Sequence, residues 1–436
     1  MIEKDALSLS RPLFIRLRKP FLLSSIFIVA VFFSPVFAQA QAGSKEICLS
    51  CHGVQGLEKV RKGKPVSLYV EREKFSQSVH GPLECTSCHR DASQVPHPPE
   101  LKLVECFTCH AGAFQAYSQS VHGKASARGD RDAASCSDCH GSHHILPAKN
   151  PDSKVYALNL PRTCGTCHGD PELAKRHRIP VANAYQLYMD SIHGRALTGS
   201  GLLVAAHCSS CHGSHEIKPK ADPESKVYRT KIPSTCGACH AGVVAEYFGG
   251  VHGRAVKGGS SVAPVCVDCH TTHEIRRVET PAWKLEIIKE CGTCHRESLR
   301  SYRDTFHGQV TALGFTRVAR CSDCHGSHRI LPASDPKSSV SRANLVSTCQ
   351  KCHPKANVNF ARFSPHADPN DKERNRGLYY AASFMNILLI GVFLFFGLHT
   401  SLWLLRSTIE MWRKRKPPEE GSDPDESEEK GGPPEA

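Results

Sequence analysis

Two long apolar runs lie near the ends of the chain, separated by a polar stretch without a regular hydrophobic period. The first run covers residues 21–37 and follows three arginines and a lysine. Small residues at Ala38 and Ala40 come next, so residues 1–40 have the order of a secretory signal peptide. An uncleaved anchor is the alternative, because the run is slightly long for a signal core. Either segment would export the residues that follow it.

The second apolar run, residues 377–405, has 29 residues without a charge and is bounded by Arg376 and Arg406. Such a helix would measure about 43 Å, enough to cross a hydrocarbon layer of about 30 Å. Basic residues at 413–416 follow, which by the positive-inside rule places the C-terminus in the cytoplasm. We therefore expect a single-pass protein of the bacterial inner membrane with a disordered cytoplasmic tail, residues 406–436.

The polar stretch, residues 41–376, is rich in Gly, Pro, Ser and Lys and offers little apolar side chain for a packed core. Its Pro-rich linkers favour turns and extended chain. Residues 243–251 and 299–306 favour short helices. We expect many short helices, irregular loops and few strands.

All 22 cysteines belong to a Cys-x-x-Cys-His motif, which occurs eleven times. In order, the motif residues are Cys48, Cys51 and His52; Cys85, Cys88 and His89; Cys106, Cys109 and His110; Cys136, Cys139 and His140; Cys164, Cys167 and His168; Cys208, Cys211 and His212; Cys236, Cys239 and His240; Cys266, Cys269 and His270; Cys291, Cys294 and His295; Cys321, Cys324 and His325; and Cys349, Cys352 and His353. The two thiols can add to the vinyl groups of a haem, and the adjacent imidazole can then ligate the iron.

Disulfides and tetrahedral zinc sites are alternatives for paired cysteines, but neither requires a histidine after every second cysteine. The sequence therefore predicts eleven covalent haem c groups, which would supply the interior that side chains do not. The predicted fold is a multihaem cytochrome of mainly short α-helices and irregular loops wrapped around covalent haems. Residues 41–376 form its periplasmic domain, and one transmembrane helix follows.

The motifs form degenerate tandem dihaem repeats. Paired motifs start 28 residues apart at Cys136 and Cys164, at Cys208 and Cys236, and at Cys321 and Cys349; the spacing is 25 at Cys266 and Cys291 and 21 at Cys85 and Cys106. Cys48 stands ahead of them as a half repeat.

Eleven further histidines are candidate ligands for the opposite faces of the irons. A first group precedes Gly or Ala: His80, His122, His193, His252, His307 and His366. A second group lies three residues after a motif histidine: His143, His215, His273 and His328. His97 resembles a longer version of the second pattern. The number of candidates equals the number of irons, and bis-histidine ligation favours low reduction potentials.

Chain length limits the reach of the second group. Each histidine of this group is separated from the preceding motif histidine by at most about 10 Å of extended chain. That length is too short for the chain to pass easily around the porphyrin of the same motif. We therefore expect it to ligate a neighbouring haem, which would join adjacent haems in a continuous electron path. His144, His177 and His207 fit neither group, and a structural role is predicted for them.

His399 lies within the second apolar run, where an ionisable side chain is costly and suggests a function. It could ligate a b-type haem shared with a partner subunit or contact a quinone, and a packing role is the alternative. Asn386 would lie about 140° away around the helix, so the two form no single polar face.

The formal net charge of +13 does not indicate a nucleic-acid partner. Each haem would add two propionates, and the ferric porphyrin core returns about one positive charge, which leaves the oxidised protein roughly neutral.

The repeated texts CHGSH(E/H/R)I, TCG(T/A)CH and S-(V/I)-HG resemble those of membrane-anchored multihaem c-type cytochromes of the cytochrome c3-like superfamily. The resemblance covers about residues 48–366. The text FFGLHTSLWLLR resembles the anchor found beside dihaem b-type subunits in quinol-oxidising complexes. This resemblance implies a separate dihaem cytochrome b subunit that oxidises menaquinol, and delivery of electrons by this chain to periplasmic or extracellular redox proteins.

Two functions follow from these features. The leading interpretation is an electron-transfer subunit for anaerobic respiration that is not itself an enzyme. The alternative is a multihaem reductase of nitrite, hydroxylamine or a sulfur oxyanion, which requires one iron with an open position. The opposite-face ligand of the first haem, at Cys48 and Cys51, is the least clearly identified, because no histidine closely follows its motif.

Overall fold

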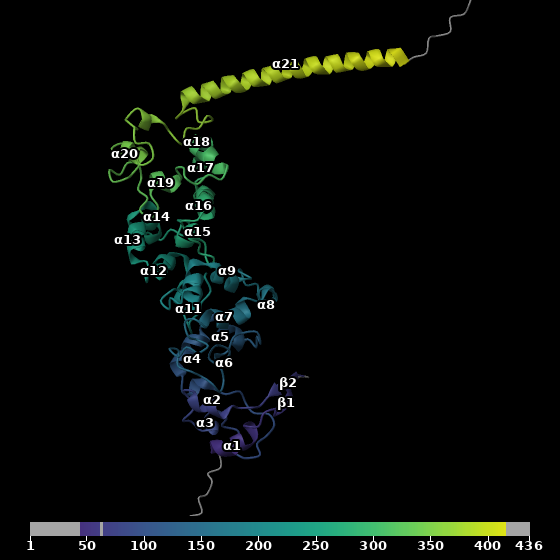
Figure 1. Ribbon diagram of the computed structural model, residues 1–436, viewed down its shortest axis with the longest axis vertical. Coiled ribbons are helices and arrows are strands. Elements are labelled where there is room, and N and C mark those ends of the chain that lie inside the picture. The colour runs from purple at the N-terminus through teal and green to yellow at the C-terminus, as the bar shows by residue number, and fades with distance from the viewer. Residues whose placement is uncertain (1–43, 62–63, 416–436) are drawn as a thin grey trace, which may run out of the picture. The chain divides into compact units, whose positions relative to one another are not determined.

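The computed structural model describes residues 44–61 and 64–415 (Figure 1). The chain divides into two compact units, Met1–Tyr69 with Glu84–Lys102, and Val70–Leu83 with Leu103–Ala436. The predicted domain of residues 41–376 is thus shared between them. The predicted signal peptide, residues 1–40, and the end of the predicted tail lie outside the described residues.

The first unit holds the first two motifs and a small hairpin. Its elements are α1 (Lys45–His52), β1 (Glu58–Arg61), β2 (Lys64–Ser67) and α3 (Cys85–Cys88). The two strands are antiparallel, with Glu58 opposite Ser67 and Lys59 opposite Val66. They form the sheet of the described residues, in agreement with the expectation of few strands.

The second unit is a succession of short helices joined by turns. Its elements are α2 (Arg72–Gln77), η1 (Cys106–Thr108), α4 (Ala111–Ser118), α5 (Val121–Ala127), α6 (Cys136–His140), α7 (Leu160–His168), α8 (Pro171–Arg176), α9 (Ala184–Asp190), α10 (Ile192–Gly194), η2 (Arg195–Gly199), α11 (Cys208–His212), η3 (Arg229–Lys231), α12 (Ile232–Gly237), α13 (Ala241–Gly249), α14 (Val251–Lys257), α15 (Cys266–His270), α16 (Pro281–Cys294), α17 (Arg296–Arg303), α18 (Phe306–Ala312), α19 (Cys321–His325), α20 (Leu345–Gln350), η4 (Phe360–Arg362) and α21 (Arg376–Arg415). Most of these elements contact the elements next to them in sequence, as expected of tandem repeats.

Local capping explains why the helices start where they do. The Ser120 hydroxyl accepts the Gly123 N–H at the start of α5, and Thr305 accepts the Gly308 N–H at the start of α18. Each side chain satisfies a backbone donor that has no partner within its helix. The helices in this part of the chain are therefore fixed by repeated local signals.

Apolar cores in the second unit are small. One cluster contains Tyr188, Leu197 and Ala205, and another contains Tyr247, Val256 and Val265. Such clusters bury few side chains for a chain of this length, in line with the low apolar content of the polar stretch.

The C-terminal helix α21 is long and apolar enough to cross a membrane. It has 40 residues, and its most apolar window has a mean hydropathy of 2.2 and is not buried. It continues past Leu405 to Arg415, so the first part of the predicted tail is helical. The ion pair between Arg406 Nε and Glu410 Oε1, 2.8 Å apart, supports this extension because residues four apart lie on one helix face.

Candidate haem sites

Four of the attachment motifs each form a helix of about one turn. The helices α6, α11, α15 and α19 each begin at the first cysteine of a motif and end at its histidine. Residues three and four apart lie on the same side of a helix, so both thiols and the imidazole face one side. This is the arrangement that one covalently attached porphyrin requires.

An acidic side chain caps several of these turns. The Asp138 carboxylate accepts the Ser135 N–H at 2.7 Å, and the Asp323 carboxylate accepts the Arg320 N–H at 2.8 Å. The caps stabilise the start of α6 and α19 and hold the first cysteine in position.

A residue in the left-handed region follows three of the motifs that precede second-group histidines. Gly141, Gly213 and Gly326 have φ of 87°, 85° and 83°. Thr271 takes the same place in the fourth copy, with φ of 64°. In the copies with Gly213, Thr271 and Gly326, the second-group histidine that follows faces a histidine of another motif.

Ten of the motif histidines face another histidine ring. The pairs, with their centroid separations, are His52 and His97 (5.9 Å), His110 and His80 (5.9 Å), His140 and His215 (6.0 Å), His168 and His122 (6.1 Å), His212 and His273 (6.1 Å), His240 and His193 (6.1 Å), His270 and His328 (6.1 Å), His295 and His252 (6.2 Å), His325 and His366 (6.1 Å), and His353 and His307 (6.1 Å). Each pair joins a motif histidine to one of the predicted opposite-face candidates.

These separations fit two imidazoles on one iron. Two metal–nitrogen bonds of about 2 Å put the nitrogens about 4 Å apart, and the ring centroids then lie about 6.2 Å apart. Parallel rings in direct face-to-face contact would be separated by only about 3.5–4 Å. The spacing of the pairs is therefore the spacing expected for two imidazoles that ligate one iron from opposite faces.

The two histidine groups differ in ring orientation. Pairs that contain a second-group histidine or His97 are nearly parallel, with interplanar angles of 10–25°. Pairs that contain a first-group histidine are tilted by 38–57°. Two classes of site thus alternate along much of the second unit.

The pairing crosses from one repeat to the next. His215 faces His140 of the preceding repeat, although it lies three residues after His212. His273 faces His212 in the same way. His89 and His143, the remaining motif histidine and candidate, lie in different compact units, and their role stays a prediction.

Neighbouring motifs also approach each other through their thiols. The first cysteines of successive motifs lie close enough to shift one another's pKa in the pairs Cys48 and Cys85, Cys106 and Cys136, Cys164 and Cys208, Cys236 and Cys266, and Cys291 and Cys321. Sulfur atoms this close would bring the edges of two attached porphyrins close together.

Burial keeps several of the paired imidazoles neutral. It lowers the pKa of His212, and the nearby imidazole of His273 lowers it further. Burial likewise lowers the pKa of His325, beside His366. The neutral imidazole is the form that ligates a metal, so the described sites favour the ligand form of these side chains.

In the pair of His52 and His97, each imidazole has a hydrogen bond with a backbone carbonyl. His52 Nδ1 lies 2.9 Å from the Leu68 carbonyl oxygen, and His97 Nδ1 lies 2.8 Å from that of Pro98. Each contact suits a proton on Nδ1 and leaves Nε2 to ligate. The His97 side chain is half-buried, like most of its counterparts.

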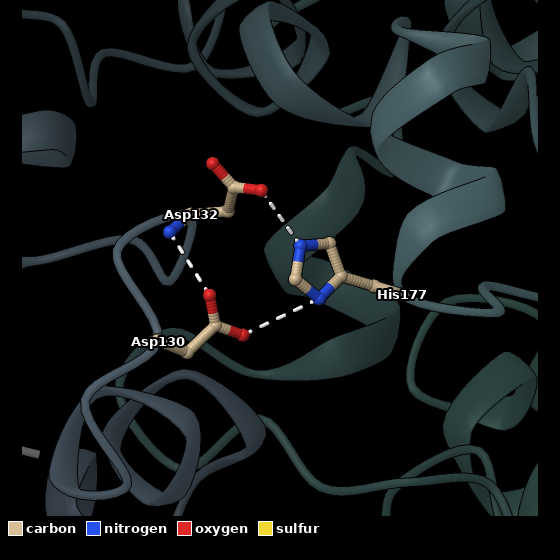
Figure 2. A group of neighbouring side chains, drawn as sticks. All are labelled: Asp130, Asp132 and His177. Carbon is tan, nitrogen blue, oxygen red and sulfur yellow. Dashed lines mark hydrogen bonds and ion pairs between the residues drawn. The ribbon is translucent and has the colours of Figure 1, made fainter.

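His177 takes part in an ion-pair cluster away from the paired imidazoles (Figure 2). Its Nδ1 lies 3.3 Å from Asp130 Oδ2, and its Nε2 lies 2.8 Å from Asp132 Oδ2. Arg176 also contacts Asp132, at 3.1 Å. The two carboxylates bind opposite edges of the ring, so the cluster is an ion pair rather than a convergent metal site.

His399 contacts a ring on its own helix. Its imidazole lies 6.5 Å from the Phe395 ring, with an interplanar angle of 10°. The proposed b-type haem or quinone contact at His399 stays a prediction. His207 Nδ1 lies 3.1 Å from the Ser209 hydroxyl, at the start of α11.

No protein-family model matches the sequence, and no solved structure matches it. The chain is 23% identical over 206 residues to a protein of Kuenenia stuttgartiensis named as a probable nitrite reductase-hydroxylamine oxidoreductase fusion protein. That relative is named as a redox enzyme. The similarity covers 42% of this chain and 22% of the relative, so the chain spans about a fifth of the relative's length.

This similarity contradicts the expectation that the chain is not an enzyme. That expectation rested on equal numbers of irons and candidate ligands. Equal numbers do not require every iron to keep two imidazoles, because a substrate can displace one axial imidazole.

The sequence interpretation missed one recurrent side chain. A tyrosine lies five residues before four of the first-group histidines, at Tyr117, Tyr188, Tyr247 and Tyr302. The spacing Tyr-x4-His, repeated four times, was the signal that could have identified it.

Proposed function

We propose that the chain is a membrane-anchored multihaem c-type cytochrome that conducts electrons along eleven bis-histidine haems. The observation that supports this most directly is the set of ten histidine pairs with centroids 5.9–6.2 Å apart, each containing a motif histidine. When bound, the haems supply the electron-carrying centres. The chain attaches them, supplies neutral imidazoles and fixes their spacing.

Conduction is supported by the proximity of successive motifs. The thiol of Cys208 lies close enough to Cys164 to raise its pKa, and the thiol of Cys266 does the same to Cys236. The thiols of successive motifs would therefore attach porphyrins whose edges nearly touch. Cross-repeat pairing, as between His140 and His215, would hold such neighbours in a fixed order.

The membrane-spanning character of α21 suggests where electrons enter or leave. His366, which faces His325, precedes the start of α21 at Arg376 by ten residues, a reach of at most about 35 Å. A dihaem cytochrome b partner that oxidises menaquinol, as in cytochrome c3-like systems, would exchange electrons there. Periplasmic or extracellular redox proteins would then be the other partners.

Reduction of a nitrogen oxyanion or hydroxylamine is a second candidate function, favoured by the name of the Kuenenia relative. It requires an iron from which one imidazole can be displaced. We choose the site of His52, because no histidine closely follows its motif and because His97, the ring that faces it, departs from the spacing of the other candidates.

The haem-loaded protein, purified from membranes, tests both functions. Intact mass should show eleven added haems, and a redox titration should place most potentials well below those of Met/His cytochromes. Quinol-dependent reduction of the membranes is expected. Few or no added haems, or strongly positive potentials, would contradict the electron-transfer proposal.

Ligand binding separates the second candidate from the first. Carbon monoxide binding to the reduced protein, a high-spin ferric signal, and oxidation of the reduced haems by nitrite would support catalysis. If neither wild type nor His97→Met binds carbon monoxide, and nitrite does not oxidise the reduced haems, conduction remains as the function.

A further inference from the structure

Four buried or half-buried tyrosines make the same hydrogen bond in successive repeats. The hydroxyls of Tyr117, Tyr188, Tyr247 and Tyr302 donate to the carbonyl oxygens of Ala134, Ala206, Pro264 and Ala319, at 2.9, 3.0, 2.8 and 2.9 Å. Each acceptor lies two residues before the first cysteine of an attachment motif. The bond spans 17 residues from Tyr117, Tyr247 and Tyr302, and 18 residues from Tyr188.

Each tyrosine also lies five residues before a first-group histidine. Tyr188 is on α9, and its backbone carbonyl accepts the Ser191 N–H and hydroxyl at 3.0 and 2.6 Å. Ser191 in turn accepts the Gly194 N–H at 3.0 Å, which fixes the turn that carries His193. The tyrosine and the histidine are thus parts of one rigid turn.

The two ends of the tyrosine bond belong to different haem sites. His193, on the turn beside Tyr188, faces His240. The acceptor Ala206 leads into the motif of His212. The hydroxyl therefore connects the opposite-face ligand of one site to the attachment segment of its neighbour.

Tyr188, Tyr247 and Tyr302 are only 9%, 9% and 6% exposed, so water does not compete strongly for their bonds. Burial raises the pKa of Tyr247 to about 12, and it raises that of Tyr188 as well. The phenol keeps the proton that it donates at any physiological pH.

We propose that these four tyrosines are positioning residues that fix the distance and orientation between the two haem sites of each repeat. The proposal rests on the proposed haem function, because positioning matters only if the motifs carry haems. The first repeat keeps the aromatic ring, as Phe75 before His80, and lacks the hydroxyl. In the four copies with tyrosine, the hydroxyl therefore adds a hydrogen bond to the packing that the ring provides.

Replacing Tyr188 with phenylalanine tests the proposal in the haem-loaded full chain. Tyr188→Phe keeps the buried ring and removes one hydrogen bond, which should increase local opening about fivefold. Hydrogen exchange should rise by that factor in residues 203–208 and 191–194. The low-spin electron paramagnetic resonance signal of one tilted site should shift or split, and electron exchange between the two adjoining haems should slow.

Tyr185→Phe is the matched control. Tyr185 lies on the same helix, its ring packs near Gly165, and its hydroxyl has no hydrogen-bond partner among the described residues. It should leave hydrogen exchange in residues 203–208 and the resonance signal unchanged. The number of haems by intact mass should be the same in wild type and in both variants.

The outcomes separate the two proposals. If wild type carries no haems, the haem function fails regardless of Tyr188. If haems are present and Tyr188→Phe leaves exchange and the signal as in wild type, or Tyr185→Phe changes them equally, the positioning role is wrong. If Tyr188→Phe does not accumulate as folded protein, Tyr247→Phe is measured in the same way between the sites of His270 and His295.

Discussion

At the scale of single residues, the haem sites depend on a few positions whose backbone or charge has little freedom. The glycine after the motif histidine is one of them. Gly326 has φ of 83°, a region in which a side chain costs about 1–2 kcal/mol. An added Cβ there would approach only the Arg329 carbonyl, at 3.5 Å, so the backbone conformation and not crowding is what favours glycine.

Gly326→Ala is therefore expected to lower the free energy of unfolding by about 1–2 kcal/mol. Denaturant unfolding of the haem-loaded protein measures this. Gly112→Ala is the control, since Gly112 lies in α4, has open space around its Cβ and should tolerate alanine or gain up to about 1 kcal/mol. Equal effects of the two substitutions would contradict the conformational explanation.

The cluster of Asp130, Asp132 and His177 gives a prediction about pH (Figure 2). Hydrogen bonds from His177 and then Arg176 hold the pKa of Asp132 below its usual value. A lowered pKa in the folded state stabilises the protein above the unfolded value of about 3.9 and stops doing so as pH falls through the folded value.

Asp132→Asn should therefore be less stable than wild type at pH 7, and the difference should be smaller at a pH below the unfolded value of about 3.9. Paired thermal unfolding experiments at the two pH values measure this. Addition of zinc at pH 7 should not raise the melting temperature, because the carboxylates contact opposite edges of the imidazole. A difference that grows on acidification would show that the charge of Asp132 is not what stabilises this turn.

At the scale of elements, the repeated unit is a helix, a turn bearing a first-group histidine, and an attachment helix. The close approach of α9 to α10 shows how tightly the turn is built. A Cβ on Gly194 would lie 2.0 Å from the Tyr188 carbonyl oxygen, and the corresponding glycines Gly123, Gly253 and Gly308 meet the same obstacle at 2.0–2.1 Å. The glycine after the histidine is thus required by packing.

Gly194→Ala should push α10 away from α9 and move His193 from the ring of His240. The cost is expected to be about 1–3 kcal/mol, and one low-spin site should become high-spin. Resonance spectra of the ferric protein and its unfolding curve measure the two effects. Gly199→Ala, with nothing within 4 Å of its Cβ, should change neither.

Sequence reasoning located the short helices better than it located their ends. Residues 243–251 were expected as one helix, but α13 ends at Gly249 and α14 begins at Val251, because Gly250 between them is extended with ψ of 172°. Residues 299–306 are divided in the same way at Thr305, whose hydroxyl caps α18. A cap inside a helical pattern ends one helix and starts the next, and periodicity alone does not reveal this.

At the scale of the whole molecule, the sequence identified the candidate histidines, and it did not reveal which of them face each other. The motif at Cys208 and Cys211 identifies its own near-face histidine because the residues are adjacent. The ring opposite His212 belongs to His273, two motifs further along the chain. That choice depends on how successive repeats pack, as in the Val121 N–H bond to the Ile217 carbonyl at 2.8 Å, and such contacts leave no local signal.

Cross-repeat pairing makes a prediction that separates it from ligation within a repeat. His215→Ala should open the iron held by His140, because His215 faces His140 at 6.0 Å and not His212. The ferric protein should gain one high-spin signal. His144→Ala, which removes a half-buried histidine outside the pairs, should leave the spectrum unchanged.

Removal of attachment cysteines identifies which iron has opened. The high-spin signal of His215→Ala should vanish when Cys136 and Cys139 are both replaced by serine, because that change removes the haem of His140. It should persist when Cys208 and Cys211 are replaced instead, with the haem count lower by one in each case. The opposite result would mean that His215 ligates the haem of its own motif, and that neighbouring repeats are held together by packing and not by shared iron ligands.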